Sequence, residues 1–229
     1  MAYRRTDKVE KRLKERRRRM LHAARTHFSA QGYAATTMQQ VAKSAGTSIG
    51  NLYFYFSNKE ELLLAVVDDF MREIGGRIDR AKALFDAGAH QIAGGVYAAI
   101  LAAMSNDQLV ALILMSDGAQ SLRQRVLEYF TARLLEFFDE HREEIPEGQH
   151  LMVAHAWQGA LFNVLEQRLS GELSCNDLEL ARFLALWNLR GLGYEQDSAE
   201  RIVRQVETRV CEEIEGFRGD STRNAVAHP

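Results

Sequence analysis

The stretch that decides the fold runs from residue 37 to residue 63 and reads TMQQVAKSAGTSIGNLYFYFSNKEELL. Thr37 is followed three residues later by Gln40, the spacing of a helix-capping box, and apolar residues then recur at helical spacing until Gly46. A second short helix follows at once, with Thr47 as its cap and the same apolar spacing. Two short amphipathic helices joined by about three residues, with glycine in the joint, predict a helix-turn-helix unit.

The start of the second helix carries the residues that would read a nucleic acid. In a helix-turn-helix unit this helix enters the major groove with its N-terminal residues at the base edges. Those residues are Ser48, Gly50 and Asn51, which lie off the apolar stripe and are small enough to allow close backbone approach. We therefore predict a base-reading surface at the start of this helix.

Basic residues flank the unit on both sides. Before it, the apolar positions from Leu13 onward predict a long helix that ends near Gly32 and carries the arginine run 16–19. After it, residues 57–60 have the form of another capping box and open a third, longer helix. Lys59 lies at the start of that helix, where its charge and the partial positive charge of the helix end suit a phosphate oxygen.

The block from Gly32 to Leu63 closely resembles the DNA-binding domain of TetR-family transcriptional regulators. The most specific part is LYFYFSNKEEL, residues 52–62, at this distance behind a basic helix. The resemblance lies within the first part of the chain. It implies an all-α fold, with an N-terminal three-helix helix-turn-helix domain and a C-terminal helical domain for ligand binding and dimerisation.

The resemblance also implies contacts with phosphates, with bases and with the sugar-phosphate wall. The residues concerned are, for phosphates, Thr37, Ser48 and Lys59; for bases, Gly50 and Asn51; and for the wall, Tyr53, Phe54 and Tyr55. The predicted DNA-binding set is completed by Arg16, Arg17 and Thr47. Many family members have histidine where Tyr55 stands, so a histidine contact is absent here. Tyr53 shares a face with the apolar stripe, which leaves open whether its ring packs in the core or against DNA.

Charge is distributed unevenly along the chain. Residues 1–59 hold 13 Lys and Arg against 3 Asp and Glu, a net charge of +10, and the remaining residues hold 16 against 28, a net charge of −12. A basic head favours a polyanionic partner. Double-stranded DNA is the first candidate and an anionic membrane surface is the second.

Composition and motifs exclude several classes of protein. Hydrophobic residues make up 46% of the 229 residues, which excludes wholesale disorder, and the presence of only 2 prolines favours long helices. The longest weakly polar stretch, residues 92–104, is shorter than the ~20 residues that span a bilayer, and no secretory signal is visible. A cytoplasmic protein without membrane contact is therefore predicted. Cys175 and Cys211 are predicted to be free thiols, and because no catalytic or metal-binding motif is present, we predict no enzyme, cofactor or metal site.

Three segments are predicted from these patterns. Residues 1–58 form the DNA-binding domain, residues 59–216 form a helical effector-binding and dimerisation domain, and residues 217–229 form a disordered polar tail. About seven helices are expected in the second segment, with breaks that include Gly75-Gly76 and Gly88.

The helix predicted over residues 150–169 is apolar nearly all round, so it must be covered on two sides. Ala156, Gly159 and Ala160 are small enough for another helix to approach closely, which predicts a second subunit on that side. The helix over residues 177–190, which carries Trp187, would be its partner. In the family resembled, the corresponding late helices form a four-helix dimer interface.

Apolar and aromatic residues of the second segment suggest either a packed core or a pocket for an apolar small molecule. The candidate effector-binding residues are Tyr97, Met104, Met115, Phe130, His155, Phe162, Asn163 and Glu166. His155, Asn163 and Glu166 would be the polar anchors, although a structural role suits His155 equally well.

The sequence thus predicts a homodimeric transcriptional regulator, in the first place a repressor. It would bind a palindromic DNA operator and be released by a small, largely apolar effector. The alternative is an architectural or partner-regulated DNA-binding protein on the same scaffold, without an effector.

Overall fold

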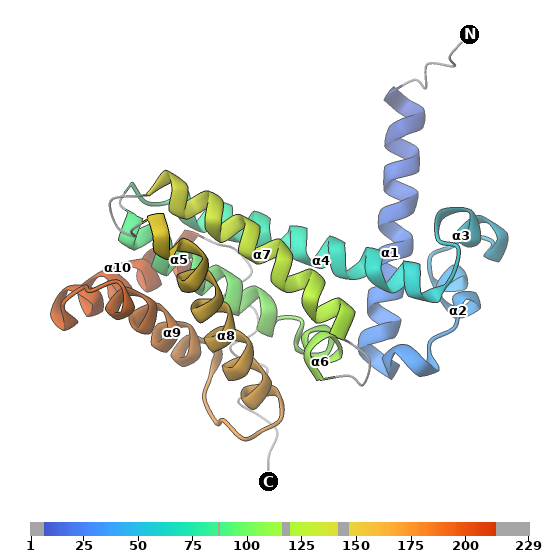
Figure 1. Ribbon diagram of the computed structural model, residues 1–229. Helices are drawn as coiled ribbons and strands as arrows, with labels where there is room; N and C mark the ends of the chain where they lie inside the picture. The colour runs from blue at the N-terminus through green and yellow to red at the C-terminus, as the bar shows by residue number, and fades with distance from the viewer. Residues whose placement is uncertain (1–6, 87, 116–119, 142–146, 214–229) are drawn as a thin grey trace. The chain divides into compact units, whose positions relative to one another are not determined.

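The computed structural model describes residues 7–86, 88–115, 120–141 and 147–213, and these ranges are helical without a strand (Figure 1). The all-α prediction is confirmed. The helices in chain order are α1 (Asp7–Ala35), α2 (Met38–Ser44), α3 (Ile49–Tyr55), α4 (Lys59–Lys82), α5 (Gly88–Met104), α6 (Asp107–Met115), α7 (Gln120–Glu140), the 3-10 turn η1 (Glu147–Gln149), α8 (His150–Leu169), α9 (Asp177–Gly191) and α10 (Gln196–Glu213).

The chain forms two compact units, Met1–Met71 and Arg72–Pro229. The division falls inside α4, whereas the domain boundary expected from the sequence was the start of that helix. The tail expected at residues 217–229 lies outside the described residues.

The first unit contains α1, α2, α3 and the first half of α4. Helix α1 begins at Asp7, earlier than the predicted start at Leu13, and it bends at Gly32, where φ is 77° and ψ is 169°. Only glycine adopts this backbone conformation at low cost, so Gly32 lets the chain turn toward α2. The core residues come from all four helices and include Met20, Phe28, Val41, Leu52, Phe56 and Leu62, each at most 2% exposed.

The second unit is organised around α5, which packs most extensively against α9 and then against α10. Small side chains allow this close approach, because Ala93 and Ala98 of α5 and Ala181 and Ala185 of α9 are fully buried. Helix α8 packs instead against α7 and α6. Helices α4 to α10 match the predicted number of helices after residue 58.

Helix α4 continues through Gly75 and Gly76, so the helix break predicted there is wrong. The glycine has a packing role instead. A Cβ added at Gly75 would lie 2.5 Å from the hydroxyl oxygen of Tyr129 in α7, a distance that real Cβ atoms do not show. Gly75 therefore permits a close approach between α4 and α7, although glycine costs a helix about 1 kcal/mol relative to alanine.

A polar cluster ties α5, α9 and α10 together. The hydroxyl of Tyr97, a fully buried residue, donates to Glu207 Oε2 at 2.5 Å, and Arg182 donates to both carboxylate oxygens at 3.0 and 2.6 Å. The hydrogen bonds from Arg182 lower the pKa of Glu207, and burial followed by the bond to Glu207 raises the pKa of Tyr97. The carboxylate is thus charged and satisfied at neutral pH.

Within the described ranges, no single helix combines the length and the apolar composition that a membrane crossing requires. Helices α5 and α6 meet that test only as a pair, and the pair is bent by 92°.

Candidate nucleic-acid interface

The joint between α2 and α3 has the geometry that the sequence predicts. At the start of α2, the Gln40 N–H donates to Thr37 Oγ1 at 3.2 Å, and the Thr37 N–H donates to Gln40 Oε1 at 2.8 Å. This confirms the capping box. After α2, Gly46 takes a φ of 64°, a left-handed conformation suited to glycine, and sends the chain into α3.

The cap of α3 is Ser48 and not Thr47. Ser48 Oγ accepts from the Asn51 N–H at 3.2 Å, as an N-cap side chain does. Thr47 Oγ1 instead accepts from the Asn51 side-chain amide at 2.6 Å. This contact fixes the orientation of the Asn51 amide across the start of α3, a contact that the sequence analysis missed.

At the start of α4, too, the cap lies one residue after the predicted position. The prediction assigned the capping box to residues 57–60, but Asn58 is the cap, because its Oδ1 accepts from the Glu61 N–H at 2.8 Å. The Glu61 carboxylate accepts from the Ser57 N–H at 2.7 Å. The chain therefore enters α4 through two bonds that involve Glu61.

The outward face of α3 carries Gly50 and Phe54. These residues are four positions apart, so they lie on one face, opposite the buried Leu52. Phe54 is 79% exposed, Tyr53 is 49% exposed, and a Cβ added at Gly50 would meet no atom within 4 Å. The exposure of Tyr53 places its ring at the surface and not in the core, and its contact with DNA stays a prediction. An open glycine beside exposed aromatic rings provides a surface that another molecule can approach closely.

Tyr55 lies apart from this face. Its hydroxyl is buried and has no hydrogen-bond partner in the described part of the chain. Its ring contacts Phe54 and Phe56, with ring centres 5.6 and 6.3 Å apart. In this structure the tip of the side chain points away from solvent, so the role of Tyr55 on the sugar-phosphate wall, which the resemblance implies, stays a prediction.

Lys59 fastens the start of α4 to the end of α1. Its Nζ donates to the carbonyl oxygens of Tyr33 at 2.8 Å, Ala34 at 3.2 Å and Thr36 at 3.0 Å. It also lies 4.4 Å from the centre of the Tyr33 ring. An ammonium group has three donors, and all three are used here. Lys59 therefore satisfies carbonyl groups left free at the end of a helix in this structure, and its contact with a phosphate stays a prediction.

The two arginines predicted to bind DNA differ in their surroundings. Arg17 is half-buried, and its guanidinium carbon lies 5.6 Å from the centre of the Phe56 ring. This places the guanidinium near the end of α3 as a cation–π contact. Arg16 is exposed and makes no hydrogen bond or ion pair within residues 7–213 as described.

The residues predicted to bind an effector occupy three kinds of environment in the second unit. Tyr97 is buried with its hydroxyl taken by Glu207, and Phe162 is buried beneath Arg123, whose guanidinium carbon lies 6.0 Å from the ring centre. Glu166 is half-buried and pairs with Arg123 at 3.5 Å. Met104 and Phe130 are half-buried, and Met115 is 44% exposed.

His155 and Asn163, predicted as polar anchors of an internal pocket, are exposed on α8. Asn163 falls on the side of α8 opposite the buried Ala154, and His155 lies on an exposed flank about 100° round the helix from Ala154, so neither points into the core of this subunit. This is a correction. The sequence could not orient α8, because its apolar residues run nearly all round the helix.

The residues predicted for a dimer interface are accessible. Ala156 and Gly159 are exposed on α8, Ala160 is half-buried, and Trp187 on α9 is 43% exposed. A Cβ added at Gly159 would meet no atom within 4 Å. Their large apolar neighbours are exposed as well: Leu151 by 54%, Met152 by 66% and Phe183 by 57%. Each of the two helices thus has an apolar face that this subunit does not cover.

Comparison with known proteins agrees with this geometry. The family described as "Bacterial regulatory proteins, tetR family" matches residues 20–66. The HTH-type transcriptional regulator HbdR of Aromatoleum sp. (strain CIB) is 32% identical over 134 residues, 54% of this chain and 56% of HbdR. The HTH-type transcriptional repressor KstR2 of Mycolicibacterium smegmatis is 40% identical over 62 residues, 27% of this chain and 30% of KstR2. The chain therefore aligns with about half or less of the length of these relatives.

The fold extends the likeness beyond the matched region. The regulator FadR from Bacillus subtilis, solved in complex with stearoyl-CoA, superposes with a TM-score of 0.64 at 18% identity, covering 75% of this chain and 96% of FadR. At this identity the superposition shows a shared fold. The matched family and these relatives are regulators and not enzymes, as the sequence predicts. Residues 20–66 are thus similar to the helix-turn-helix of the TetR family of transcriptional regulators, and the helical fold that follows is shared with FadR.

Proposed function

We propose that this chain is a homodimeric transcriptional repressor that binds a palindromic operator and is released by a small, largely apolar effector. The observation that carries the proposal is the outward face of α3, with Gly50 open and Phe54 79% exposed, in a head of net charge +10. A major groove admits an α-helix, and phosphates attract the surrounding cations. The name of KstR2 as a repressor supports the direction of regulation. A role on bacterial DNA supports a cytoplasmic location.

The test of DNA binding uses the full chain. Duplexes selected by the protein from a random-sequence pool should share two inverted half-sites, because a two-fold dimer presents two recognition helices. The logarithm of affinity should fall linearly with the logarithm of salt concentration, by about 0.9 per phosphate contact. If no duplex is enriched, or if affinity ignores salt, the proposal is wrong.

The dimer is supported by the exposed apolar faces of α8 and α9. The exposed Gly159 has open space around its Cβ position, so a single subunit tolerates Gly159→Arg, whereas a dimer contact would bury an unpaired charge at a cost of several kcal/mol. We expect this variant to sediment as a folded monomer and to lose operator affinity. A variant that remains dimeric with full binding would place the interface elsewhere.

The proposal of an apolar effector is supported by Met104 and Phe130, which are half-buried in the second unit, and by the stearoyl-CoA bound to FadR. A ligand that binds better to a conformation unable to fit the operator shifts the population away from DNA. A thermal-shift screen of the full chain against acyl-CoAs and other apolar metabolites should find a ligand that raises Tm and releases DNA.

The alternative, regulation by a partner without an effector, is favoured by one observation. Three predicted pocket residues are already used or exposed: Tyr97 binds Glu207, and His155 and Asn163 face outward. If no metabolite in the screen shifts Tm while specific DNA binding is intact, this alternative replaces the effector.

A further inference from the structure

Helix α1 begins well before the region that matches the family. The match starts at residue 20, whereas the helix starts at Asp7. Residues 7–19 therefore add about three and a half turns of helix to the front of the DNA-binding unit. Val9 is 38% exposed and Leu13 is only half-buried, so little apolar packing holds this extension. The other described side chains of the extension are mostly charged.

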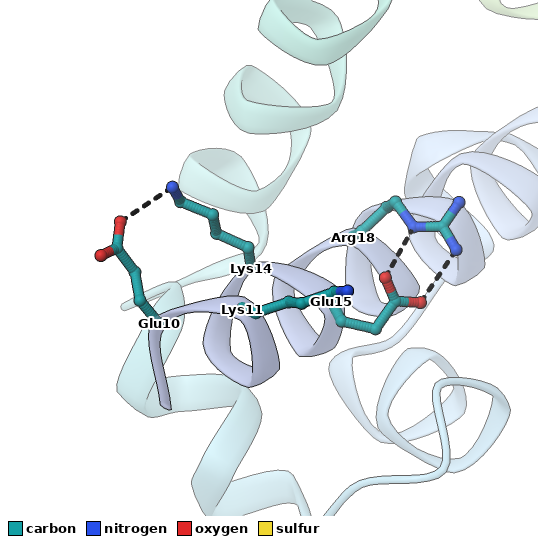
Figure 2. A pocket seen from close by; sticks show the side chains of 5 residues that line it. All are labelled: Glu10, Lys11, Lys14, Glu15 and Arg18. Atoms are coloured by element: carbon teal, nitrogen blue, oxygen red, sulfur yellow. Dashed lines mark hydrogen bonds and ion pairs between the residues drawn. The ribbon is translucent and has the colours of Figure 1, made fainter. Parts of the chain in front are cut away.

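One face of the extension is neutralised within the helix, as Figure 2 shows. Lys14 pairs with Glu10 at 2.8 Å, and Arg18 donates to both carboxylate oxygens of Glu15 at 2.8 and 3.3 Å. The bond from Arg18 lowers the pKa of Glu15, so the pair stays charged. Lys11 lies beside these two pairs. We call Lys11, Lys14 and Arg18 the paired face.

A second face carries three arginines that form no bond with an acid, although Glu15 lies four residues before Arg19 and interacts with it electrostatically. Arg12, Arg16 and Arg19 are spaced i, i+4 and i+7, which aligns them along one side of the helix. All three are exposed, and none makes a hydrogen bond or an ion pair with the parts of the chain that the structure describes. We call these three residues the arginine stripe.

The arginine stripe is unfavourable for the helix by itself. Like charges four residues apart on a helix, such as Arg12 and Arg16, repel one another. Glu10 and Glu15 are both bonded on the paired face, and Glu15 offsets the stripe only through a weaker electrostatic interaction with Arg19. A polyanion would relieve this repulsion.

The stripe lies along the flank of α1 that leads to the helix-turn-helix. Steps of four residues continue from Arg19 through Ala23 to His27, and His27 Nε2 is 2.8 Å from Ser44 Oγ at the end of α2. On the neighbouring side, Arg17 contacts Phe56 just after α3. The extension thus projects from the part of α1 against which the DNA-reading helices pack.

We propose that the arginine stripe binds the phosphate backbone of DNA next to each half-site and so widens the operator beyond the base pairs that α3 reads. This inference rests on the proposed DNA-binding function. From Arg12 to Arg19 the helix rises about 10 Å, roughly three base-pair steps along a strand, which suits up to three phosphates. Arginine is the residue best matched to phosphate because its planar donors bind two oxygens at once.

The test compares two triple variants of the full chain that remove the same charge from the same helix. Arg12→Gln with Arg16→Gln and Arg19→Gln alters the stripe, and Lys11→Gln with Lys14→Gln and Arg18→Gln alters the paired face. Each is titrated at several salt concentrations onto an operator selected with wild-type protein, as a short duplex that ends at the half-sites and as a duplex extended by about one helical turn on each side.

On the extended duplex, the stripe variant should bind at least 10-fold more weakly than wild type, and its salt slope should be smaller by up to about 2.7 per subunit. On the short duplex the same variant should lose less than 3-fold, as should the paired-face variant on both duplexes. Circular dichroism should show that both variants keep their helix content, so that a loss of binding is not a loss of folding.

Equal losses for the two triple variants would overturn the proposal, because they would reflect net charge alone. Loss of binding to phosphatidylglycerol vesicles with unchanged DNA binding would overturn it too, and would assign the stripe to a membrane. Failure of the wild type to select any duplex would instead overturn the proposed function itself.

Discussion

The hydrogen bonds inside the first unit differ in sequence separation from those inside the second unit. In the first unit, the elements start and stop through hydrogen bonds between residues three or four positions apart, such as Thr37 with Gln40 and Ser48 with Asn51. In the second unit, the Tyr97–Glu207 bond joins residues 110 positions apart, and α5 packs against helices that follow it by more than 70 residues.

The surfaces of the two units also differ in charge and in apolar exposure. The first unit presents cations and the aromatic face of α3, which suits a partner of uniform chemistry, the DNA duplex. The second unit presents apolar faces on α8 and α9, which suit a second copy of the chain. If this contrast is correct, substitutions in the two units should have separable effects on DNA affinity and on stability.

The largest of these effects is expected at Gly50. Gly50→Leu places a branched side chain at the centre of the outward face of α3, where the free protein has open space but a base edge would not. We expect operator affinity to fall at least 100-fold, about 2.7 kcal/mol, with Gly50→Ala in between. Fluorescence anisotropy with the selected operator measures the loss. The free energy of unfolding should not fall, because leucine favours helix more than glycine does.

The next largest effect is expected on the free energy of unfolding, from loss of the hydrogen bonds that Lys59 donates. Lys59→Met keeps the length of the side chain but removes three donors from the carbonyls at the end of α1. Hydrogen bonds to charged groups contribute about 1.5–3 kcal/mol. The carbonyl of the exposed Ala34 can regain water, whereas Thr36 is buried, so we expect about 2 kcal/mol of destabilisation in urea unfolding followed by circular dichroism. Lys43→Met, on an exposed residue of α2, is the matched control. Weaker DNA binding without any loss of stability would restore the phosphate contact predicted from the sequence.

The polar cluster of Tyr97, Arg182 and Glu207 predicts that the free energy of unfolding depends on pH. The pKa of Glu207 is lowered in the folded chain, so the unfolded chain takes up this proton first as the solution is acidified. The stabilisation is therefore complete above the ordinary pKa of glutamate and is lost as pH falls toward the folded value. Glu207→Gln should cost about 1 kcal/mol at pH 7 and progressively less below the ordinary pKa.

Trp157 and Trp187 lie in the second unit, so their fluorescence during urea unfolding reports on this change. Arg201→Gln, an exposed change on the same helix α10, is the control and should leave the pH dependence of wild type intact. A difference between Glu207→Gln and wild type that stays constant from pH 7 to a pH well below the ordinary pKa of glutamate would contradict the role assigned to the carboxylate.

The sequence predicts most of the helical elements well because apolar residues recur within them and local signals mark many of their ends. The bounds of α8 agree with the predicted range of residues 150–169, and those of α9 agree to within one residue. The caps of α3 and α4 were each displaced by one position, because Thr47 and Ser48, like Ser57 and Asn58, are all chemically able to cap a helix. Only the backbone geometry selects between such neighbours.

The parts that could not be predicted depend on contacts between distant residues. Lys59 reaches carbonyls 23 to 26 positions away, and nothing in the local pattern distinguishes that use of an ammonium from a phosphate contact. The orientation of α8 was similarly hidden, so His155 and Asn163 were assigned to the wrong side. The residues of a site are thus easier to predict than the direction in which each one points.

The smallest change in the free energy of unfolding is expected at Tyr55, where it tests which way the hydroxyl points. Its buried hydroxyl has no partner in the described part of the chain, and an unsatisfied buried polar group costs about 1–3 kcal/mol. Tyr55→Phe removes that oxygen alone, so we expect a gain of up to about 1 kcal/mol in the free energy of unfolding and no change in operator affinity. Tyr53→Phe, on the exposed neighbour, should leave stability unchanged. If Tyr55→Phe instead weakens operator binding at unchanged stability, then the hydroxyl turns toward DNA in the complex, and the contact implied by the family resemblance is correct after all.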